Sequence, residues 1–439
     1  DGNEYIEAAL SSGARVVVAE GRQPESVRSK QVFFVTVKNS RRALAELANQ
    51  FYARPSQALK VVGVTGTNGK TTVTYLVEAI SREAGFTPAV IGTINHRFKD
   101  TVISSKNTTP GPVELQALLS RMRDCRVRYC AMEVSSHALD QDRVQGIKFS
   151  AAIFTNLTQD HLDYHLTFAQ YFKAKAKLFM GLDFKSFAVI NGDDVFGKKL
   201  IGLTKAKVIT YGIDGKADVT AVELSSGVNG TEFTVLDSEG KTQIKSGLIG
   251  KHNVYNILAA FAWGLKEGIH PRVIKSAIEK FTLVPGRLER VDCAGGYSVF
   301  VDYAHTDDAL KNIIQSLRQV GDKRIIVVFG CGGERDKGKR PKMGRVVSEL
   351  SDYAIITNDN PRSEDPMQII EDIKKGIKKD NFCVIPERIE AIRKSLSMAS
   401  QGDIVLVAGK GHEDYQIIGN RTLRFDDREV VKECLKSQI

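Results

Sequence analysis

Residues 61–72, VVGVTGTNGKTT, decide the fold of this chain. An apolar run with strand character breaks into a glycine-rich turn, and a helical pattern follows directly. Backbone N–H groups of such a turn can surround an anion, Lys70 can reach the β- and γ-phosphates of a nucleotide, and a threonine hydroxyl can hold Mg²⁺. The alternative is an ordinary turn, since the general pattern G-x-x-x-x-G-K-[ST] would have glycine where Val64 stands. We predict an ATP site formed by Gly66, Thr67, Asn68, Gly69, Lys70, Thr71 and Thr72.

The length and composition limit the classes of protein. A chain of 439 residues is too long for one hydrophobic core and indicates two or three domains. With 42% hydrophobic and 26% charged residues the composition is that of a globular protein, and no apolar run approaches the roughly 18 residues that a membrane span needs. The net charge is +10, but the basic residues are scattered without interleaved aromatics. We therefore expect small polyanionic ligands and no nucleic acid.

The six cysteines predict neither a zinc site nor disulfides, because none belongs to a C-x-x-C pair. We therefore expect a cytoplasmic protein. The sequence opens at Asp1 without methionine or a signal-like segment, inside the pattern of a domain already begun. We expect residues upstream of it to be missing.

The chain predicts three α/β parts. Residues 1–58 have the pattern of the remainder of a small domain, with apolar runs at 14–19 and 31–37 and a helix at 40–52. Residues 59–285 and 286–439 each alternate strands with helices, and the Pro285-Gly286 break between them suits a hinge. Buried strands are predicted at 61–65, 129–134, 151–155, 187–190, 299–302, 324–329, 353–357 and 403–408, and an antiparallel hairpin within 218–248.

Polar residues gather where predicted strands end, which is the edge at which open α/β sheets bind ligands. Glu133 could bind an Mg²⁺ shared with the phosphate-loop threonine, or it could be a surface acid. Residues 156–165 contain two His and two Asp, which suggests a second metal site, although a lone histidine such as His165 is more often structural.

Two helical segments allow two interpretations each. The lysines of 171–179 would by default form a solvated basic face. Asn253 and Asn256, which lead into a helix at 257–265, could present amides to a base or ribose, or Asn253 could cap the helix. Turns rich in glycine, arginine and acids, suited to a carboxylate and an ammonium, are predicted at 332–341, 359–362 and 409–413.

The ordered set of motifs resembles the Mur ligases of the UDP-N-acetylmuramoyl-tripeptide synthetase type over nearly the whole chain. The resemblance implies an α/β fold of three domains: part of a UDP-binding domain at 1–58, a P-loop ATPase at 59–285, and a Rossmann-like domain at 286–439 that receives the amino acid. The matching motifs are GTNGKTT (66–72), EVSSH (133–137), NLTQDHLDYH (156–165), HNVYN (252–256), DYAH (302–305) and GKGHE (409–413).

The resemblance also implies roles for single residues. Lys70, Glu133, His161 and Lys175 would be catalytic, with Lys175 carbamylated so that an anionic group holds a second Mg²⁺. The metal ligands would be Thr71, Glu133, His161 and this carbamate. Further ATP contacts would be Asn253, Arg287, Asp302 and Lys337. The contacts to the UDP-muramoyl-dipeptide would be Asn107, Thr108, Thr109, Ser135, Gln141 and Arg143.

Substrate choice would lie in Asp359-Asn360-Pro361-Arg362, which resembles the signature of enzymes that add meso-diaminopimelate. Arg335 and Arg362 would bind the distal carboxylate. Lysine lacks that group and would leave the arginines unpaired, at a cost of at least a few kcal/mol. Gly409 and Glu413 would surround the distal ammonium.

The implied activity is ATP-dependent amide formation in peptidoglycan precursor synthesis, which serves cell-wall growth, cell shape and cell division. The D-glutamyl γ-carboxylate of the UDP-linked dipeptide would attack the γ-phosphate, and the amine would then attack the acyl phosphate. Two Mg²⁺ ions and closure about the hinge would assist. We expect a monomer whose partners are small molecules.

Two departures and three alternatives accompany this resemblance. The uridine motif of the first domain is absent because the chain starts after it, and Asp307 stands where the family usually has proline. A folate or other amino-acid ligase is disfavoured by the 107–109 and 359–362 motifs. A non-catalytic scaffold would not need the four catalytic residues, and a nucleic-acid-binding ATPase would need a salt-dependent affinity that we do not expect.

Overall fold

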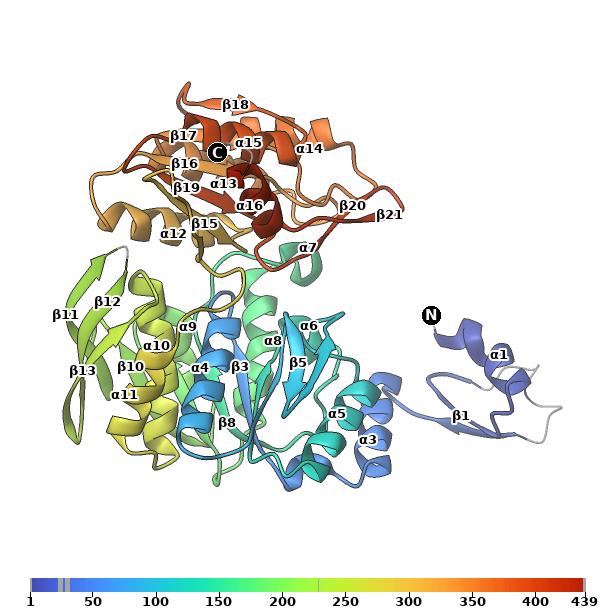
Figure 1. Cartoon of the computed structure of the whole chain (residues 1–439). Helices are drawn as coiled ribbons and strands as arrows, with labels where there is room; N and C mark the ends of the chain where they lie inside the picture. Colours follow the sequence, from blue (N-terminus) through green and yellow to red (C-terminus); the bar gives the residue numbers. More distant parts are fainter. Residues whose placement is uncertain (1, 23–26, 28–31, 228, 437–439) are drawn as a thin grey trace.

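The computed structural model describes residues 2–22, 27, 32–227 and 229–436. A small N-terminal segment, a domain on an eleven-stranded sheet and a domain on a six-stranded sheet follow one another along the chain. In Figure 1 the N-terminal segment projects to one side, and the six-stranded domain lies above the eleven-stranded one. The α/β class is confirmed, while the boundaries at 58/59 and 285/286 remain predictions.

The N-terminal segment has a small hydrophobic cluster of Ile6, Val17, Ala19 and Val27 with their neighbours. Strands β1 (Val16–Ala19) and β2 (Phe33–Thr36) pair in parallel, so each of the two apolar runs contains a strand, and residue 31 lies outside the described part. The predicted helix is α3 (Ser40–Phe51), capped by Asn39. The remaining elements are η1 (Gly2–Tyr5), α1 (Ile6–Ser11) and η2 (Pro55–Gln57).

The central domain is built on a mixed sheet with the strand order β13-β12-β11-β10-β9-β8-β3-β7-β4-β5-β6. Neighbours from β11 to β4 pair in parallel, and both ends of the sheet are antiparallel. The hairpin predicted within 218–248 is confirmed as β11 to β13, whereas β4 to β6 and β10 were not predicted. The strands are β3 (Lys60–Thr65), β4 (Pro88–Ile91), β5 (Asn95–Phe98), β6 (Thr101–Ser104), β7 (Tyr129–Glu133), β8 (Phe149–Phe154), β9 (Phe187–Asn191), β10 (Lys207–Gly212), β11 (Val219–Gly227), β12 (Gly230–Asp237) and β13 (Gly240–Ser246).

Helices cover both faces of this sheet, so the strand before the phosphate loop is buried on each side. Val62 and Val64 belong to the core shared with α4 and α10, and Val61 belongs to the core on the opposite face, as the period of two requires. Burial on both faces explains the continuous apolar run that opens the motif. The helices are α4 (Lys70–Glu83), α5 (Pro112–Asp124), α6 (Ser136–Asp140), α7 (Leu162–His165), α8 (Phe168–Met180), α9 (Val195–Ile201), α10 (Lys251–Lys266) and α11 (Pro271–Lys280).

The C-terminal domain has the strand order β14-β15-β19-β16-β17-β18, with parallel pairing from β15 to β18. Because β19 inserts between β15 and β16, the loops after these strands open at a point where ligands bind in such sheets. The strands are β14 (Glu289–Val291), β15 (Ser298–Asp302), β16 (Ile325–Phe329), β17 (Tyr353–Ile356), β18 (Phe382–Val384) and β19 (Ile404–Ala408), with a separate hairpin of β20 (Tyr415–Ile418) and β21 (Arg421–Arg424). The helices are α12 (Asp307–Gln319), α13 (Lys339–Leu350), α14 (Pro366–Lys374), α15 (Arg388–Met398) and α16 (Asp427–Lys436).

All six cysteines are free thiols, in agreement with the prediction of no disulfide framework. Over the described ranges, every helix is too short or too polar to cross a bilayer.

Candidate active site

The phosphate loop connects β3 to α4 and is packed closely against the loop that follows β8. A Cβ on Gly66 would overlap the Thr155 hydroxyl, and a Cβ on Gly69, whose φ is +87°, would overlap the side-chain oxygen of Asn256. Thr155 Oγ1 also donates to the Asn68 carbonyl at 2.6 Å. The glycines are therefore required by close packing, which holds the loop in one shape at the N-terminus of a helix, as a phosphate site needs.

Two lysines converge on this loop. Lys70 donates to the carbonyls of Gly66 (3.0 Å) and Thr67 (2.8 Å), and Lys175 from α8 donates to the same Gly66 carbonyl at 2.8 Å. Burial lowers the pKa of both amines, and the charge of Lys70 helps to hold that of Lys175 well below its ordinary value. The default interpretation of a solvated face is wrong for Lys175, which is buried, whereas Lys173 is exposed.

Glu133, at the end of β7, is buried, so the alternative that it is a surface acid is wrong. Its carboxylate accepts from Thr71 Oγ1 (3.1 Å) and from the hydroxyl and N–H of Thr93 (3.0 and 2.9 Å). Arg287 Nη2 of the C-terminal domain donates to the same Thr71 hydroxyl at 3.1 Å. A carboxylate and a hydroxyl thus lie together at the phosphate loop, as an Mg²⁺ site bound with nucleotide phosphates requires.

His161 stands just before α7 with φ +55°, and its ring lies among other polar rings. Its Nε2 is 3.4 Å from Asp160 Oδ2, and its centroid is 4.9 Å from that of His137. Burial lowers the pKa of His161 to about 3 despite the nearby Asp160, so the imidazole is neutral, which is the form that binds metals. His165 is buried with its ring centroid 5.2 Å from that of Tyr171, which suits the structural interpretation.

The predicted metal ligands are side-chain types that can bind Mg²⁺, but they do not lie close enough together to hold an ion by themselves. In the ranges that the structure describes, no three His, Cys, Asp or Glu side chains come together to hold an ion, and the suggested second site within 156–165 gains no support. Thr71, Glu133 and His161 offer a hydroxyl, a carboxylate and a neutral imidazole, and Lys175 would become an oxygen ligand only as a carbamate. This donor set fits Mg²⁺ bound together with phosphate oxygens and water.

A cavity beside the phosphate loop is lined by both domains. Asn256 Nδ2 donates to Asn253 Oδ1 at 3.0 Å, and because α10 begins at Lys251 with Gly250 as its N-cap, the interpretation of Asn253 as the cap is wrong. Burial raises the pKa of Asp302, in the same wall, to about 6. The sequence-predicted nucleotide residues that line this cavity are Asn68, Gly69, Thr71, Thr72, Asn253, Arg287 and Asp302.

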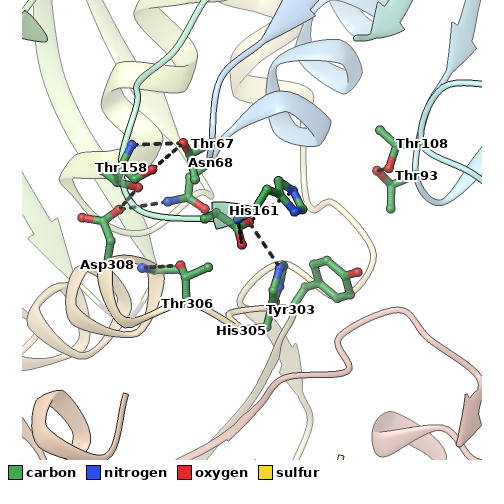
Figure 2. Close-up of polar contacts among 12 residues, drawn as sticks. Thr67, Asn68, Thr93, Thr108, Thr158, His161, Tyr303, His305, Thr306 and Asp308 are labelled. Carbon is green, nitrogen blue, oxygen red and sulfur yellow. Dashed lines mark hydrogen bonds and ion pairs between the residues drawn. The ribbon is translucent and has the colours of Figure 1, made fainter. Parts of the chain in front are cut away.

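The C-terminal domain contacts the phosphate loop through Asp308 in the first turn of α12 (Figure 2). Its Oδ2 accepts from Asn68 Nδ2 (2.9 Å), from Thr158 Oγ1 (3.3 Å) and from Asn312 Nδ2 (3.2 Å). His305, on the loop after β15, points toward the same region, with Nε2 4.0 Å from Asp160 Oδ2. The Asp308 carboxylate therefore links the C-terminal domain to the nucleotide loop of the central domain.

Replacing Asp308 with alanine should weaken nucleotide binding, because two donors of the central domain lose their shared acceptor. Hydrogen bonds to a charged group are worth about 1.5–3 kcal/mol, so we expect an affinity loss of about 10–100-fold, measured by calorimetric titration with ADP. Asp307→Ala is the matched control, since Asp307 Oδ1 is buried without a hydrogen-bond partner and its removal should leave binding unchanged. Equal affinities of the two variants would contradict this role.

A larger cleft of ≈ 600 Å³ lies between the two domains, and hydroxyl and amide groups form its central-domain wall. Thr109 Oγ1 donates to the Glu133 carbonyl (2.8 Å) and accepts from Ser135 N (3.0 Å), and Arg143 Nη1 donates to the Thr109 carbonyl (3.0 Å). Gln141 Oε1 accepts two bonds from the Arg143 guanidinium, so it orients Arg143 without lining the cleft itself. The predicted dipeptide residues that line the cleft are Asn107, Thr108, Thr109, Ser135 and Arg143.

Arg362 lines the opposite wall, where a strand of the β20–β21 hairpin holds its backbone. With φ +54°, Arg362 donates its N–H to the Ile417 carbonyl (3.1 Å), and its Nη1 donates to the Gly333 carbonyl (2.7 Å). Arg335 is exposed on the same wall. Two guanidinium groups thus face the cleft from separate turns.

Acidic and amide groups lie beside these arginines. Asn360 Nδ2 donates to Glu413 Oε2 (2.9 Å), and Asn360 Oδ1 accepts from Lys410 Nζ (3.1 Å). Burial and the Asp359 charge raise the pKa of Glu413, whereas the charges of Lys410, Arg388 and other nearby cations together outweigh the burial of Asp359 and lower the pKa of that carboxyl. A Cβ on Gly409, whose φ is +118°, would overlap Asp359 Oδ2. The predicted residues on this wall are Arg335, Asp359, Asn360, Arg362, Gly409 and Glu413.

Family models match most of the chain. The model of the Mur ligase middle domain matches residues 64–264, and the model of the Mur ligase glutamate ligase domain matches residues 286–411. The chain belongs to the Mur ligase family. The three-domain Mur ligase architecture predicted from the sequence is thereby confirmed as the fold.

Relatives of this Mur ligase carry a more specific name. UDP-N-acetylmuramoyl-L-alanyl-D-glutamate--2,6-diaminopimelate ligase of Clostridium tetani is 45% identical over 99% of this chain and 90% of its own length, and that of Geobacillus kaustophilus is 44% identical over 100% and 90%. A solved structure of the same name matches with a TM-score of 0.69 at 33% identity, over 99% of this chain and 89% of the other. Mycobacterium tuberculosis folylpolyglutamate synthase matches with a TM-score of 0.70, but at 17% identity over 84% and 92% it shows the fold alone.

One residue of this Mur ligase that was predicted to contact ATP, Lys337, lies outside both the nucleotide cavity and the cleft. Lys337 is exposed, its Nζ is 3.3 Å from Glu364 Oε2, and it lines neither the nucleotide cavity nor the cleft. Its neighbour Lys339 is buried and lines the cleft. Neither Lys339 nor Asp308 was predicted as a site residue, because nothing in their own turns indicates that they lie between the two domains.

Proposed function

We propose that this Mur ligase joins 2,6-diaminopimelate to UDP-N-acetylmuramoyl-L-alanyl-D-glutamate with ATP as the phosphoryl donor. One observation carries the proposal: Tyr303 and His305 line both the nucleotide cavity and the cleft, so the two spaces meet. The phosphate loop on one side can bind a phosphoryl donor, and the two arginines on the other side can bind a carboxylate of a dicarboxylic amino acid, so the two substrates would be close to each other. The names of relatives at 44–45% identity agree.

The phosphate loop would bind the nucleotide phosphates, and Lys70 would exchange its two carbonyl acceptors for the γ-phosphate. Arg287 would add a second cation to this side through its contact with Thr71. Mg²⁺ bound near Thr71, Glu133 and His161 would supply positive charge that offsets repulsion between the attacking carboxylate and the γ-phosphate. The cleft wall around Thr109 and Arg143 would hold that carboxylate in line.

Lys175 would serve as a carbamate. Burial and the charge of Lys70 hold the pKa of its amine well below the ordinary value, so the uncharged form that attacks CO₂ is more populated than in an exposed lysine, and the new C–N bond forms as one proton leaves. An ordinary lysine with a pKa near 10.4 is uncharged in only about 0.04% of molecules at pH 7. The carbamate would carry a negative charge beside Lys70, which would relieve the repulsion between two amines that share one acceptor.

The rate of this carbamylation should fall by less than tenfold per pH unit between pH 9 and pH 7 at a fixed pressure of ¹³CO₂. Lowering the pKa of Lys175 keeps the reactive, unprotonated amine populated as pH falls, whereas an ordinary lysine would lose about tenfold in rate per pH unit. The measurement is the growth of a protein-bound carbamate signal by ¹³C NMR, with Lys175→Met to identify the signal. A tenfold fall per unit would contradict the depressed pKa.

On the other wall, Arg335 and Arg362 would bind the distal carboxylate of diaminopimelate, and Glu413 and Asp359 would lie near the ammonium groups. The pKa of Glu413 is raised by burial and Asp359 although Lys410 lies 3.5 Å away, so an additional ammonium from the ligand would favour its ionised form. The amine that attacks the acyl phosphate must lose its proton. Its approach would follow closure about the 285–286 hinge, where Gly286 has φ +66°.

The test is phosphate release from ATP in the presence of UDP-N-acetylmuramoyl-L-Ala-D-Glu, with diaminopimelate or lysine as the added amino acid. We expect release and a tripeptide product with diaminopimelate and at least 1,000-fold less with lysine, the scale on which polar sites reject analogues that lack a bonded group. Equal use of lysine would refute the assignment of the arginines. No turnover with either would favour the scaffold alternative. We expect a cytoplasmic, monomeric enzyme, which gel filtration with light scattering would check for the oligomeric state.

A further inference from the structure

Lys339 differs from every other buried cation in the described part of the chain. Five lysine and arginine side chains are buried there: Lys175, Lys339, Arg340, Arg388 and Lys410. Four of them have acceptors, which are the Gly66 carbonyl for Lys175, Glu364 and Asp372 for Arg340, Asp427 for Arg388, and Asn360 with Glu413 for Lys410. Among the described residues, the Lys339 ammonium has neither a hydrogen bond nor an ion pair within 4.0 Å, although only 6% of the residue is exposed.

The burial of the residue holds the Lys339 stem in place, and an ammonium without an acceptor at a cleft wall is available to an anion that enters the cleft. Lys339 is the first residue of α13, a helix of 12 residues whose N-terminal N–H groups also favour negative charge. It lines the interdomain cleft together with His305 and Asp160. The side chain is therefore held at the cleft with an unmet requirement for an anion.

The groups around Lys339 indicate which part of the cleft it serves. Its charge contributes to lowering the pKa of Asp160, of Asp359 and of His305, the last to about 4 behind the larger effect of burial. Asp160 also lies within the electrostatic reach of Lys70 and Lys175. Lys339 therefore approaches, from the C-terminal domain, the same region that the phosphate-loop lysines approach from the central domain.

We propose that Lys339 binds the phosphoryl group while it passes from the nucleotide to the substrate carboxylate, and then binds the acyl phosphate. This inference rests on the proposed function. The step forms a bond between a carboxylate oxygen and the γ-phosphorus, breaks the bond from that phosphorus to the β,γ-bridging oxygen, and leaves ADP with the bonding pair. Lys339 donates to the phosphoryl oxygens throughout and transfers no proton.

A carboxylate of the added amino acid is the other anion that Lys339 could bind. Arg335 and Arg362 already provide guanidinium groups on the same wall, and a guanidinium matches a carboxylate through its two-pronged geometry. A lysine is a compact point charge that suits a phosphoryl group whose oxygens move during transfer. Formation of the acyl phosphate, which requires no amino acid, distinguishes the two alternatives. Loss of Lys339 should slow this step only if Lys339 binds the phosphoryl group.

The experiment compares Lys339→Met with Arg345→Met, a control that removes one exposed cation from the same helix, where Arg345 pairs only with Glu349. Acyl phosphate is formed from ATP and UDP-N-acetylmuramoyl-L-Ala-D-Glu without diaminopimelate and trapped by borohydride reduction. We expect Lys339→Met to lower the rate of trapping and the full-reaction kcat by about 100-fold or more, with KM for diaminopimelate unchanged within about twofold. Lys339→Arg should recover part of the rate.

The unfolding temperature is a second measurement that separates this role from a structural one. A lysine that stabilised the fold would lower the unfolding temperature when replaced, whereas we expect no such fall. Because methionine keeps a long apolar stem and the ammonium has no acceptor to lose, Lys339→Met should unfold at the same temperature as the wild type or higher. A lower unfolding temperature together with a matching loss in both half-reactions would assign Lys339 to structure and overturn the proposal. Normal acyl phosphate formation with a raised KM for diaminopimelate would assign it to the amino acid and also overturn it.

The failure of the proposed function would look different. Wild-type protein that releases no phosphate with either amino acid would refute the ligase assignment itself. Wild-type turnover with an unimpaired Lys339→Met variant would refute only the role of Lys339. Lys337→Met distinguishes the residue implied by the family resemblance from the one that the cleft favours, and we expect its loss of kcat to be at least tenfold smaller.

Discussion

Methionine in place of Lys175 should lower the rate of tripeptide formation by about 1,000-fold, the upper range for removing one preorganised charge from an active site. The variant cannot form a carbamate, so an anion beside Lys70 and the phosphate loop is lost. Bicarbonate should not restore its activity, whereas wild-type protein depleted of CO₂ should regain activity when bicarbonate is added.

Lys173→Met is the control for this loss, because it removes one exposed cation from the same helix. The fold of the Lys175→Met variant should persist, since a buried apolar side chain replaces a buried amine whose pKa is already depressed. Unfolding temperatures of both variants check this point. A Lys175→Met protein with more than a tenth of the wild-type rate would show that no carbamate is needed.

Methionine in place of Arg362 should sharply reduce the preference for diaminopimelate over lysine. Truncating one partner of a buried, charge-assisted contact costs about 2–5 kcal/mol, which corresponds to a loss of kcat/KM for diaminopimelate of about 30–5,000-fold. The value for lysine should stay level or rise slightly, because lysine has no distal carboxylate to lose. The ratio of the two kcat/KM values, measured by phosphate release, is the result that decides.

Arg421→Met is the control for Arg362, since Arg421 is an exposed arginine on the hairpin that holds the Arg362 backbone. Met and Arg are equally strained at φ +54°, so the substitution leaves the backbone requirement unchanged. If Arg362→Met reduced the use of both amino acids equally, the guanidinium would serve the fold of the turn through its bond to the Gly333 carbonyl and not the choice of substrate.

The predictions made from local patterns agree with the structure where one stretch of chain contains all the determinants. The strand, glycine turn and helix of residues 61–72 are contiguous, and the predicted sheet strands match the observed ones within about two residues. The antiparallel hairpin was recognised because its alternation has a period of two. Short strands such as β5 and β6 carry too few residues to show any period.

The burial of Lys175 is predictable from the helical spacing of its apolar neighbours. Tyr171, Ala174, Lys175 and Leu178 follow the spacing of an apolar helical stripe, and all four are buried. A lysine at a stripe position is expected inside, not on a solvated face. Its neighbour Lys173 lies off the stripe and is exposed.

The sequence by itself determined the phosphate loop and the order of the ligand-binding turns, because glycine conformations and strand-to-helix turns are properties of adjacent residues. Only the tertiary structure decided which cations lose water and which carboxylate reaches another domain. Lys175 meets the phosphate loop across 109 residues, and Asp308 meets it across 240. Lys339 became notable only when packing buried it without an anion. The burial of a side chain and its hydrogen-bond or ion-pair partners depend on contacts between segments that are distant in the sequence. A local pattern contains no information about which segment will pack against it.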